Sequence, residues 1–276
     1  MERSAMEISG ELPQSSAYIV GIGASAGGLN ALEQFFDTMP TDSGMVFVII
    51  QHLSPDFKSL MGELLSRHSS MPVHLSSNGL VLKPNNIYLI PPKTQMTVTN
   101  ETLFLTERVV THNVELPIDL FFHSLAEDAG EHSIGIILSG TGSDGSRGIR
   151  SIHTKGGLVL VQSPESAQFD GMPRTAIASG VCDRILSPEE MPRFLTEYCA
   201  NPLVVKSGGA HAFDVFEGEG EYAGIFALLR RSCNLDFSKY KGATVGRRIV
   251  RRMESLQLSQ AADYTTILAG DRKSVV

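Results

Sequence analysis

The sequence contains few cysteines and no long apolar run. Its three cysteines, Cys182, Cys199 and Cys233, are far apart and odd in number, so they suggest neither a disulfide framework nor a metal site. We therefore expect a reducing, cytoplasmic location. No apolar stretch approaches the ~20 residues of a membrane-spanning helix, so direct membrane insertion is not expected. Residues 1–16 lack the apolar core of a signal peptide and predict a disordered leader.

The charge of the chain is unevenly distributed. Residues 1–229 hold 13 basic and 26 acidic side chains, whereas residues 230–276 hold 10 basic and 4 acidic ones. Such a contrast indicates two modules with different surfaces. Between them, residues 201–222 are rich in glycine, alanine and acid, which is typical of a linker. We expect one domain at 17–200 and a small, all-helical module at 223–276.

The first of these domains alternates between continuous apolar runs and segments of helical periodicity. The apolar runs predict buried strands, which start at Tyr18 and recur at 45–50, 86–90, 133–139, 157–161 and 182–186. Helical spacing separates them, at 29–39, 57–68, 117–131, 146–153, 173–178 and from a capping box at Ser187 to about residue 200. Residues 95–106 alternate as a hairpin does. The pattern predicts an α/β fold with an open, mostly parallel, doubly wound sheet.

The strand-to-helix turn at residues 23–28 (Gly-Ala-Ser-Ala-Gly-Gly) organises the rest of the chain. Ser25 is its only polar side chain and lies where the helix begins. The small neighbours let a substrate approach the backbone closely. Backbone N–H groups of a first helical turn stabilise negative charge. Ser25 is therefore a candidate nucleophile, with an oxyanion site at the N–H groups of Ala26 and Gly27.

Two other interpretations of this turn are open. Gly21, Gly23 and Ala26 fit the relaxed G-x-G-x-x-A fingerprint of dinucleotide-binding proteins. That fingerprint expects an acidic residue near the end of the second strand, where this chain has Gln51 and His52. The other interpretation is a glycine-rich packing turn without chemistry. We expect no cofactor, and no metal, since the remaining histidines show no ligand spacing such as HExxH.

Three reactive side chains, Ser25, His52 and Asp144, each follow the C-terminal end of a predicted strand. In a parallel sheet these ends open on one edge, and that edge holds the active site. The placement predicts a nucleophile, its base and a carboxylate that orients the base. Taken singly, a histidine after a strand is usually solvated and an Asp-Gly pair is usually a turn. Their joint placement beside the serine turn favours a catalytic triad.

Four segments together resemble the catalytic domain of chemotaxis receptor methylesterases of the CheB type. They occur in the family's order at residues 23–28, 51–53 (Gln-His-Leu), 138–145 (Leu-Ser-Gly-Thr-Gly-Ser-Asp-Gly) and 171–174 (Gly-Met-Pro-Arg). The resemblance covers about residues 17–198. It implies hydrolysis of glutamate methyl esters on receptor signalling helices, and deamidation of receptor glutamines by the same chemistry. It also implies Ser25 as nucleophile, His52 as base and Asp144 as the orienting carboxylate.

The resemblance also places residues around the oxyanion and substrate pocket. These residues are Ala26, Gly27, Thr141 and Met172. Ala26 stands where the family usually has threonine, and Thr141 stands where methionine is common, which affects rate and substrate fit more than the triad. The family's receiver domain, with its phospho-accepting aspartate, has no counterpart in residues 1–16.

The C-terminal module resembles a second family. Residues 235–241 (Leu-Asp-Phe-Ser-Lys-Tyr-Lys) and 247–253 (Arg-Arg-Ile-Val-Arg-Arg-Met) look like the helical N-terminal domain of CheR-type receptor methyltransferases, over about 223–270. Those enzymes bind S-adenosylmethionine with a following α/β domain, which this sequence does not contain. We therefore expect the front part of a methylesterase–methyltransferase fusion that does not itself methylate.

A basic cluster lies within this module. Its members, at i, i+1, i+4 and i+5 on one face of a predicted helix, are Arg247, Arg248, Arg251 and Arg252. A solvated basic face is one interpretation, and docking on the acidic methylation helices of chemoreceptors is the other. Nucleic acid is not an expected partner, because the net charge is −7 and no aromatic platform accompanies the arginines.

The placement of Ser25, His52 and Asp144 thus predicts a serine carboxylic-ester hydrolase, and the resemblance implies a protein-glutamate methylesterase that acts in the adaptation of chemotaxis signalling. The alternative is a catalytically inactive module that binds receptors or serves as a scaffold.

Overall fold

The computed structural model describes residues 17–51, 61–107, 116–200, 225, 258 and 261–270. The chain divides into two compact units, Met1–Glu189 and Glu190–Val276. Among the described helices, none is both long and apolar enough to cross a membrane.

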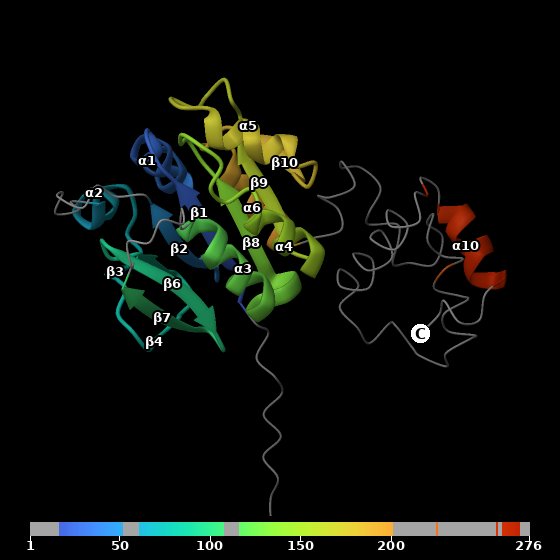
Figure 1. The fold of residues 1–276 in the computed structure, drawn as a ribbon, viewed down its shortest axis with the longest axis horizontal. Coiled ribbons are helices and arrows are strands. Elements are labelled where there is room, and N and C mark those ends of the chain that lie inside the picture. Colours follow the sequence, from blue (N-terminus) through green and yellow to red (C-terminus); the bar gives the residue numbers. More distant parts are fainter. Residues whose placement is uncertain are drawn as a thin grey trace, which may run out of the picture. The chain divides into compact units, whose positions relative to one another are not determined.

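A seven-stranded parallel sheet forms the centre of the first unit (Figure 1). Its order is β10-β9-β8-β1-β2-β5-β3. The strands are β1 (Ile19–Ala24), β2 (Val46–Gln51), β3 (Val73–Leu75), β5 (Asn86–Leu89), β8 (Ser133–Ile137), β9 (Leu158–Gln162) and β10 (Arg184–Leu186). The predicted α/β class with a mostly parallel sheet is confirmed.

Helices cover both faces of this sheet, and a smaller antiparallel sheet lies beside it in the order β4-β7-β6. The helices of the unit are α1 (Gly28–Thr38), α2 (Met61–His68), α3 (Pro117–Ala129), α4 (Gly148–Lys155) and α5 (Gly171–Ala178), with a 3-10 turn, η1 (Gly130–His132). The small sheet consists of β4 (Leu80–Val81), β6 (Thr94–Thr99) and β7 (Thr102–Glu107). The last two strands form the hairpin that the sequence predicts.

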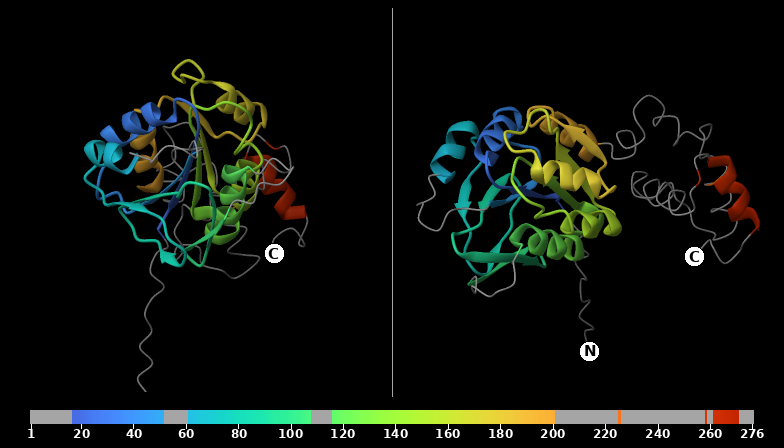
Figure 2. Two further views of the ribbon diagram at one scale, coloured as in Figure 1. Left: turned by 60° about the vertical axis from the view of Figure 1, so that its left-hand side comes forward. Right: turned by 45° about the horizontal axis from the view of Figure 1, so that its top comes forward.

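Strand β2 shows how one apolar run serves two layers. On one face, Phe47 meets Phe36 of α1 edge to face, with ring centroids 5.6 Å apart. On the other face, Val48 and Ile50 join the core that contains Phe121 of α3. Figure 2 shows α1 (blue) and α3 (green) on opposite sides of the central strands. A continuous apolar run is therefore required, because both faces of the strand are buried.

Glycines in β1 let α3 approach the sheet closely. A Cβ at Gly23 would lie 2.5 Å from Ile118, and one at Gly21 would lie 2.9 Å from Phe122. Both distances are shorter than real Cβ contacts. The glycine pattern that also fits a dinucleotide fingerprint thus has a packing reason in this fold.

The parallel register aligns the C-terminal ends of the three central strands. Gly23 of β1 pairs with Ile50 of β2 on one side and with Ile137 of β8 on the other. The residues that follow these strands, from Ser25 and from Leu138 onward, therefore emerge at one edge of the sheet, as the sequence predicts.

One predicted boundary is wrong. Helix α6 spans Met191–Ala200 and does not start at the capping box of Ser187. Residues 188–190 form a turn instead. Pro192 gives the reason: a proline lacks the N–H that a helix interior needs, so it is tolerated only in a first turn, which here begins at Met191. Strands β3 and β4 have no counterpart in the sequence prediction.

In the second unit, the structure describes α6 and α10 (Ala261–Gly270). Tyr264 and Leu268, four residues apart, share a buried face of α10. The predicted linker at 201–222 and most of the helical module lie outside the described residues, and so do the leader and residues 57–60 of the second predicted helix.

Candidate active site

Ser25 lies in the tight turn between β1 and α1. Its N–H donates to the carbonyl of Ser139 over 3.0 Å, which ties the turn to the end of β8. Its own carbonyl accepts the N–H of Gly28 over 2.9 Å. Gly27 caps the helix with φ of +72°, a left-handed conformation that glycine adopts without strain. The serine therefore sits half-buried beside the N-terminus of an eleven-residue helix.

Two backbone amides follow Ser25 directly before α1. Within the part of the chain that the structure describes, the N–H groups of Ala26 and Gly27 donate to no protein acceptor. Unsatisfied N–H groups at a helix N-terminus attract negative charge. These are the two residues at which the sequence predicts an oxyanion site, and that site stays a prediction.

Gly140 brings Ser25 and Met172 together. A Cβ at Gly140 would lie 2.8 Å from the Cβ of Ser25 and 2.2 Å from the Sδ of Met172, so only glycine fits between them. Met172 is buried, and its N–H donates to the carbonyl of Gly140 over 2.9 Å. Thr141, the next residue, is exposed on the loop that follows β8. Met172 thus lies near Ser25 across Gly140, whereas Thr141 is placed only by its position next to Gly140.

Asp144 is buried, and backbone N–H groups hold both of its carboxylate oxygens. Oδ2 accepts the N–H of Ile118 over 3.0 Å, and Oδ1 accepts those of Asp119 over 2.9 Å and Gly145 over 2.8 Å. Ile118 and Asp119 belong to the first turn of α3, where a negative charge is stabilised. The carboxylate is therefore fixed in position, as a group that orients a base must be.

Asp119 repeats this arrangement one helix further. Its Oδ1 accepts the N–H groups of Arg147 and Gly148 at the start of α4, over 2.9 and 2.7 Å. Its Oδ2 is buried and has no hydrogen-bond partner in the described residues. Burial, and to a smaller extent the nearby charge of Asp144, raise the pKa of Asp119 above its ordinary value. The loop that carries Asp144 is thus held from both ends.

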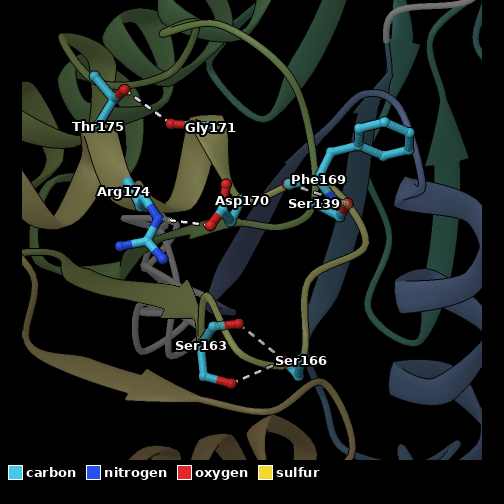
Figure 3. Close-up of polar contacts among 8 residues, drawn as sticks. All are labelled: Ser139, Ser163, Ser166, Phe169, Asp170, Gly171, Arg174 and Thr175. Atoms are coloured by element: carbon cyan, nitrogen blue, oxygen red, sulfur yellow. Dashed lines mark hydrogen bonds and ion pairs between the residues drawn. The ribbon is translucent and has the colours of Figure 1, made fainter.

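Ser139 is a residue of this site that the sequence does not reveal. It is buried, and its Oγ donates to the carbonyl of Ala26 over 2.8 Å. The same Oγ accepts the N–H of Phe169 over 3.0 Å, a contact that Figure 3 shows. Its N–H donates to Oε1 of Gln162 over 2.7 Å. Ser139 therefore connects the serine turn, the end of β8 and the segment before α5.

Gln51 ends β2, in register with Ala24, and its side chain lies beside the serine turn. Its Nε2 would be 3.7 Å from a Cβ at Gly28, while its Oε1 is buried with no hydrogen-bond partner in the described residues. His52, the predicted base, follows directly and lies outside the described residues. The same holds for the four arginines of the basic cluster, Arg247, Arg248, Arg251 and Arg252.

The described residues contain no group of three or more histidine, cysteine or acidic side chains that is placed to hold a metal ion.

Comparison with known proteins finds two family matches. The model of the CheB methylesterase family matches residues 20–195, and that of the CheR methyltransferase all-alpha domain matches residues 220–275. The crystal structure of the Thermotoga maritima CheB methylesterase catalytic domain is similar, with a TM-score of 0.61 and 28% identity. It covers 66% of this chain and 99% of the Thermotoga chain.

Curated relatives support the same assignment. An uncharacterized 104.1 kDa protein of Rhodobacter capsulatus is 36% identical over 231 residues, which are 77% of this chain and 24% of that protein. A protein-glutamate methylesterase/protein-glutamine glutaminase of Desulfitobacterium hafniense is 31% identical over 195 residues, 68% of this chain and 50% of that protein. A putative one of Leptospira interrogans is 32% identical over 186 residues, 66% of this chain and 95% of that protein.

The chain thus spans about a quarter of the Rhodobacter relative and half of the Desulfitobacterium one. A family match over residues 20–195, on a parallel sheet of the same fold, identifies this chain as a member of the CheB methylesterase family that also carries a CheR all-alpha domain match.

Proposed function

We propose that the chain is a protein-glutamate methylesterase, which hydrolyses γ-methyl esters on the cytoplasmic methylation helices of chemoreceptors. In this proposal residues 17–200 form the catalytic domain, 201–222 the linker and 223–276 the helical module. The names of the relatives support the reaction, since three of the curated proteins most similar to the chain are named protein-glutamate methylesterase/protein-glutamine glutaminase. The reaction serves adaptation in chemotaxis signalling.

In the proposed reaction, Ser25 Oγ attacks the ester carbonyl while His52 removes the hydroxyl proton. Asp144 holds the imidazole in the required tautomer and stabilises the charge that forms on it. The N–H groups of Ala26 and Gly27 receive the oxyanion of the tetrahedral intermediate. His52 then protonates the departing methanol, and a water molecule cleaves the acyl-enzyme to give free glutamate and Ser25.

Deamidation of receptor glutamines fits the same site. The acyl group that Ser25 takes up is identical for a glutamine side chain, and ammonia leaves in place of methanol. The protonated imidazole supplies the proton that this poorer leaving group needs.

The observation that carries the proposal is the position of Ser25. It lies beside the N–H groups of Ala26 and Gly27, which have no acceptor in the described residues, and a Cβ at Gly140 would clash with both Ser25 and Met172. Asp144, on the loop that starts at Gly140, accepts three backbone N–H groups, two from α3 and one from Gly145. A nucleophile, anion-binding amides and a fixed carboxylate together form the parts of an acyl-transfer site.

Methanol release from a methylated receptor fragment tests the proposal. Ser25→Ala and His52→Ala should each remove nearly all activity, and the double variant should lose little more, because triad members act as a unit. Ser43→Ala is the matched control, since Ser43 precedes β2 at the opposite edge of the sheet. Methanol release by Ser25→Ala at the wild-type rate would show that Ser25 is not the nucleophile. A wild-type chain that binds receptor and releases no methanol would favour the alternative, a receptor-binding module whose active site no longer works.

A further inference from the structure

The segment 163–170 is anchored to the serine turn through its backbone. The carbonyl of Phe169 accepts the N–H of Gly140 over 2.9 Å, and the N–H of Phe169 donates to Ser139 Oγ over 3.0 Å. Ser139 in turn accepts the N–H of Ser25 at its carbonyl. Phe169 and the candidate nucleophile Ser25 are therefore both hydrogen-bonded to the same residue, Ser139.

Both ends of this segment are also held, as Figure 3 shows. At the start, Ser163 and Ser166 join their hydroxyl groups over 2.9 Å. At the end, Arg174 forms an ion pair with Asp170 over 2.5 Å, one turn away on α5. The backbone at residues 168–169 is thus fixed relative to Ser25, although it belongs to an irregular segment.

Gln168 lies directly against the serine turn. Its Cβ and its Oε1 are each 2.8 Å from the position that a Cβ would take at Gly27. The glycine therefore leaves the space that the glutamine side chain occupies. The side-chain amide of Gln168 makes no hydrogen bond within the described residues, and the residue is exposed.

Phe169 is 41% exposed although its backbone is part of this network. A single exposed phenylalanine is ordinary by itself. Here, however, an exposed ring and an exposed amide, which makes no hydrogen bond to the described residues, belong to consecutive residues of a segment that is hydrogen-bonded to Ser139 and Gly140. Binding residues are typically carried in this way, on loops that a rigid scaffold positions.

We propose that Gln168 and Phe169 form a substrate lip that determines specificity for a polypeptide substrate. The amide of Gln168 hydrogen-bonds to peptide or carboxamide groups that flank the ester, and the ring of Phe169 packs on the aliphatic part of a neighbouring side chain. The inference rests on the proposed esterase function and adds to it: the lip acts on the part of the substrate that does not react, so a small ester does not need it.

The test compares two esters in the full chain. The first is a helical peptide of alanines and glutamates that carries one glutamate γ-methyl ester, and the second is 4-nitrophenyl acetate. Gln168→Ala should raise KM for the peptide about fivefold to tenfold, the size of one lost hydrogen bond, with kcat within about twofold. Phe169→Ala should do the same through lost apolar contact, by about tenfold. Neither should change kcat/KM for 4-nitrophenyl acetate.

A matched control is available on the small sheet. Phe104 is 42% exposed, nearly the same as Phe169, and lies on β7, in an antiparallel sheet that is separate from the strands around Ser25. Phe104→Ala should leave both KM values unchanged. Gln168→Met, which keeps the length of the side chain without the hydrogen-bonding groups of the amide, should behave as Gln168→Ala does.

Binding makes the result independent of turnover. In the Ser25→Ala background, the Kd of the same peptide should rise by the same factors with Gln168→Ala and Phe169→Ala. Unchanged Kd and KM would overturn the lip, as would an equal loss on peptide and 4-nitrophenyl acetate, because the residues would then act through the serine turn. A wild-type chain that releases no methanol would refute the esterase proposal alone, and the Kd comparison would still decide the lip.

Discussion

Asp144 and Asp119 are linked directly, because Oδ1 of Asp144 accepts the backbone N–H of Asp119 over 2.9 Å. Asp144 thereby accepts N–H groups from the first turn of α3. Asp119, which belongs to that turn, accepts the N–H of Gly148 at the start of α4 over 2.7 Å. Two carboxylates thus connect the loop between β8 and α4 to helix α3: Asp144 lies on the loop and bonds to α3, and Asp119 lies on α3 and bonds to the start of α4. The position of the candidate catalytic carboxylate depends on both helices.

Asp144→Asn should lower both stability and activity. At least one of the three amides that now donate to the carboxylate would face an amide NH₂, which cannot accept. We expect the free energy of unfolding to fall by about 1–3 kcal/mol for the lost bond to a charged group. Methanol release should fall by a factor on the order of 10⁴, as in other triads that lose this carboxylate. Urea unfolding and a methanol assay measure the two effects.

Asp128→Asn separates these two roles. Asp128 also accepts backbone amides, those of Asn100 and Glu101 at the hairpin turn, away from Ser25. The Asp128→Asn variant should therefore have a lower free energy of unfolding and an unchanged rate of methanol release. Near wild-type methanol release by Asp144→Asn would show that Asp144 only caps α3 and that another group orients the base.

Asp119 should give stability a pH dependence of recognisable sign. Its pKa is raised, so the folded state holds this proton more tightly than the unfolded chain does. The protonated form of Asp119 therefore contributes to the free energy of unfolding. This contribution is fully present below the pKa of the unfolded chain, about 3.9, and is lost as pH rises through the pKa of the folded state. Asp119→Asn does not titrate, so its stability relative to the wild type should increase as pH rises from about 4 and then level off. Urea unfolding at several pH values measures this.

Glu127→Gln is the control with the opposite sign. The hydrogen bond from Lys155 lowers the pKa of Glu127, so its contribution is present above the unfolded value and is lost as pH falls through the folded pKa. The stability of Glu127→Gln relative to the wild type should therefore decrease as pH rises, by a small amount because the pair is exposed. A flat difference curve for Asp119→Asn would contradict the assigned pKa shift.

The sheet was predictable because its central strands are buried on both faces. A strand buried on both faces must be apolar at every position, as β2 is at Phe47, Val48 and Ile50. Parallel topology then determines which edge of the sheet holds the polar loops. Strands β3 and β4 escaped prediction because they are three and two residues long. Leu75 and Val81 in them are 62% and 53% exposed, so burial imposes little pattern there.

In the site, the sequence indicated Ser25 and Asp144 by their residue types, and the structure adds what holds them. The bond from Ser139 Oγ to Ala26 joins residues 113 positions apart, and the one from Ile118 to Asp144 joins residues 26 apart. No periodicity or motif spacing in the sequence predicts either bond. The sequence pattern predicts only that Ser139 ends the strand at 133–139 and that Asp119 lies in the helix at 117–131. The roles of His52 and of the basic cluster stay predictions.

The basic cluster should act on receptor and not on a small ester. Replacing Arg247, Arg248, Arg251 and Arg252 by glutamine in the full chain removes four positive charges that would attract acidic methylation helices. We expect slower methanol release from intact receptor at low salt, with the difference shrinking as salt screens the contact. Hydrolysis of 4-nitrophenyl acetate should not change. Equal receptor activity at low salt would leave the arginines as a solvated face.

Ser139→Ala should impair the serine turn, and Ser139→Thr should restore it. The alanine variant loses the hydroxyl that donates to Ala26 and accepts from Phe169, so the serine turn and segment 163–170 keep their backbone bonds at Ser139 and Gly140 but lose the side chain that holds both. We expect kcat to fall about tenfold to a hundredfold on peptide and on 4-nitrophenyl acetate alike, because a small displacement of a nucleophile is costly. Threonine keeps the hydroxyl and should recover most of the rate. Ser166→Ala, which removes a hydroxyl from the same segment without touching Ser25, should have little effect on kcat. If Ser139→Thr is as slow as Ser139→Ala while both unfold like the wild type, the size of the side chain and not its hydrogen bonds sets the position of Ser25.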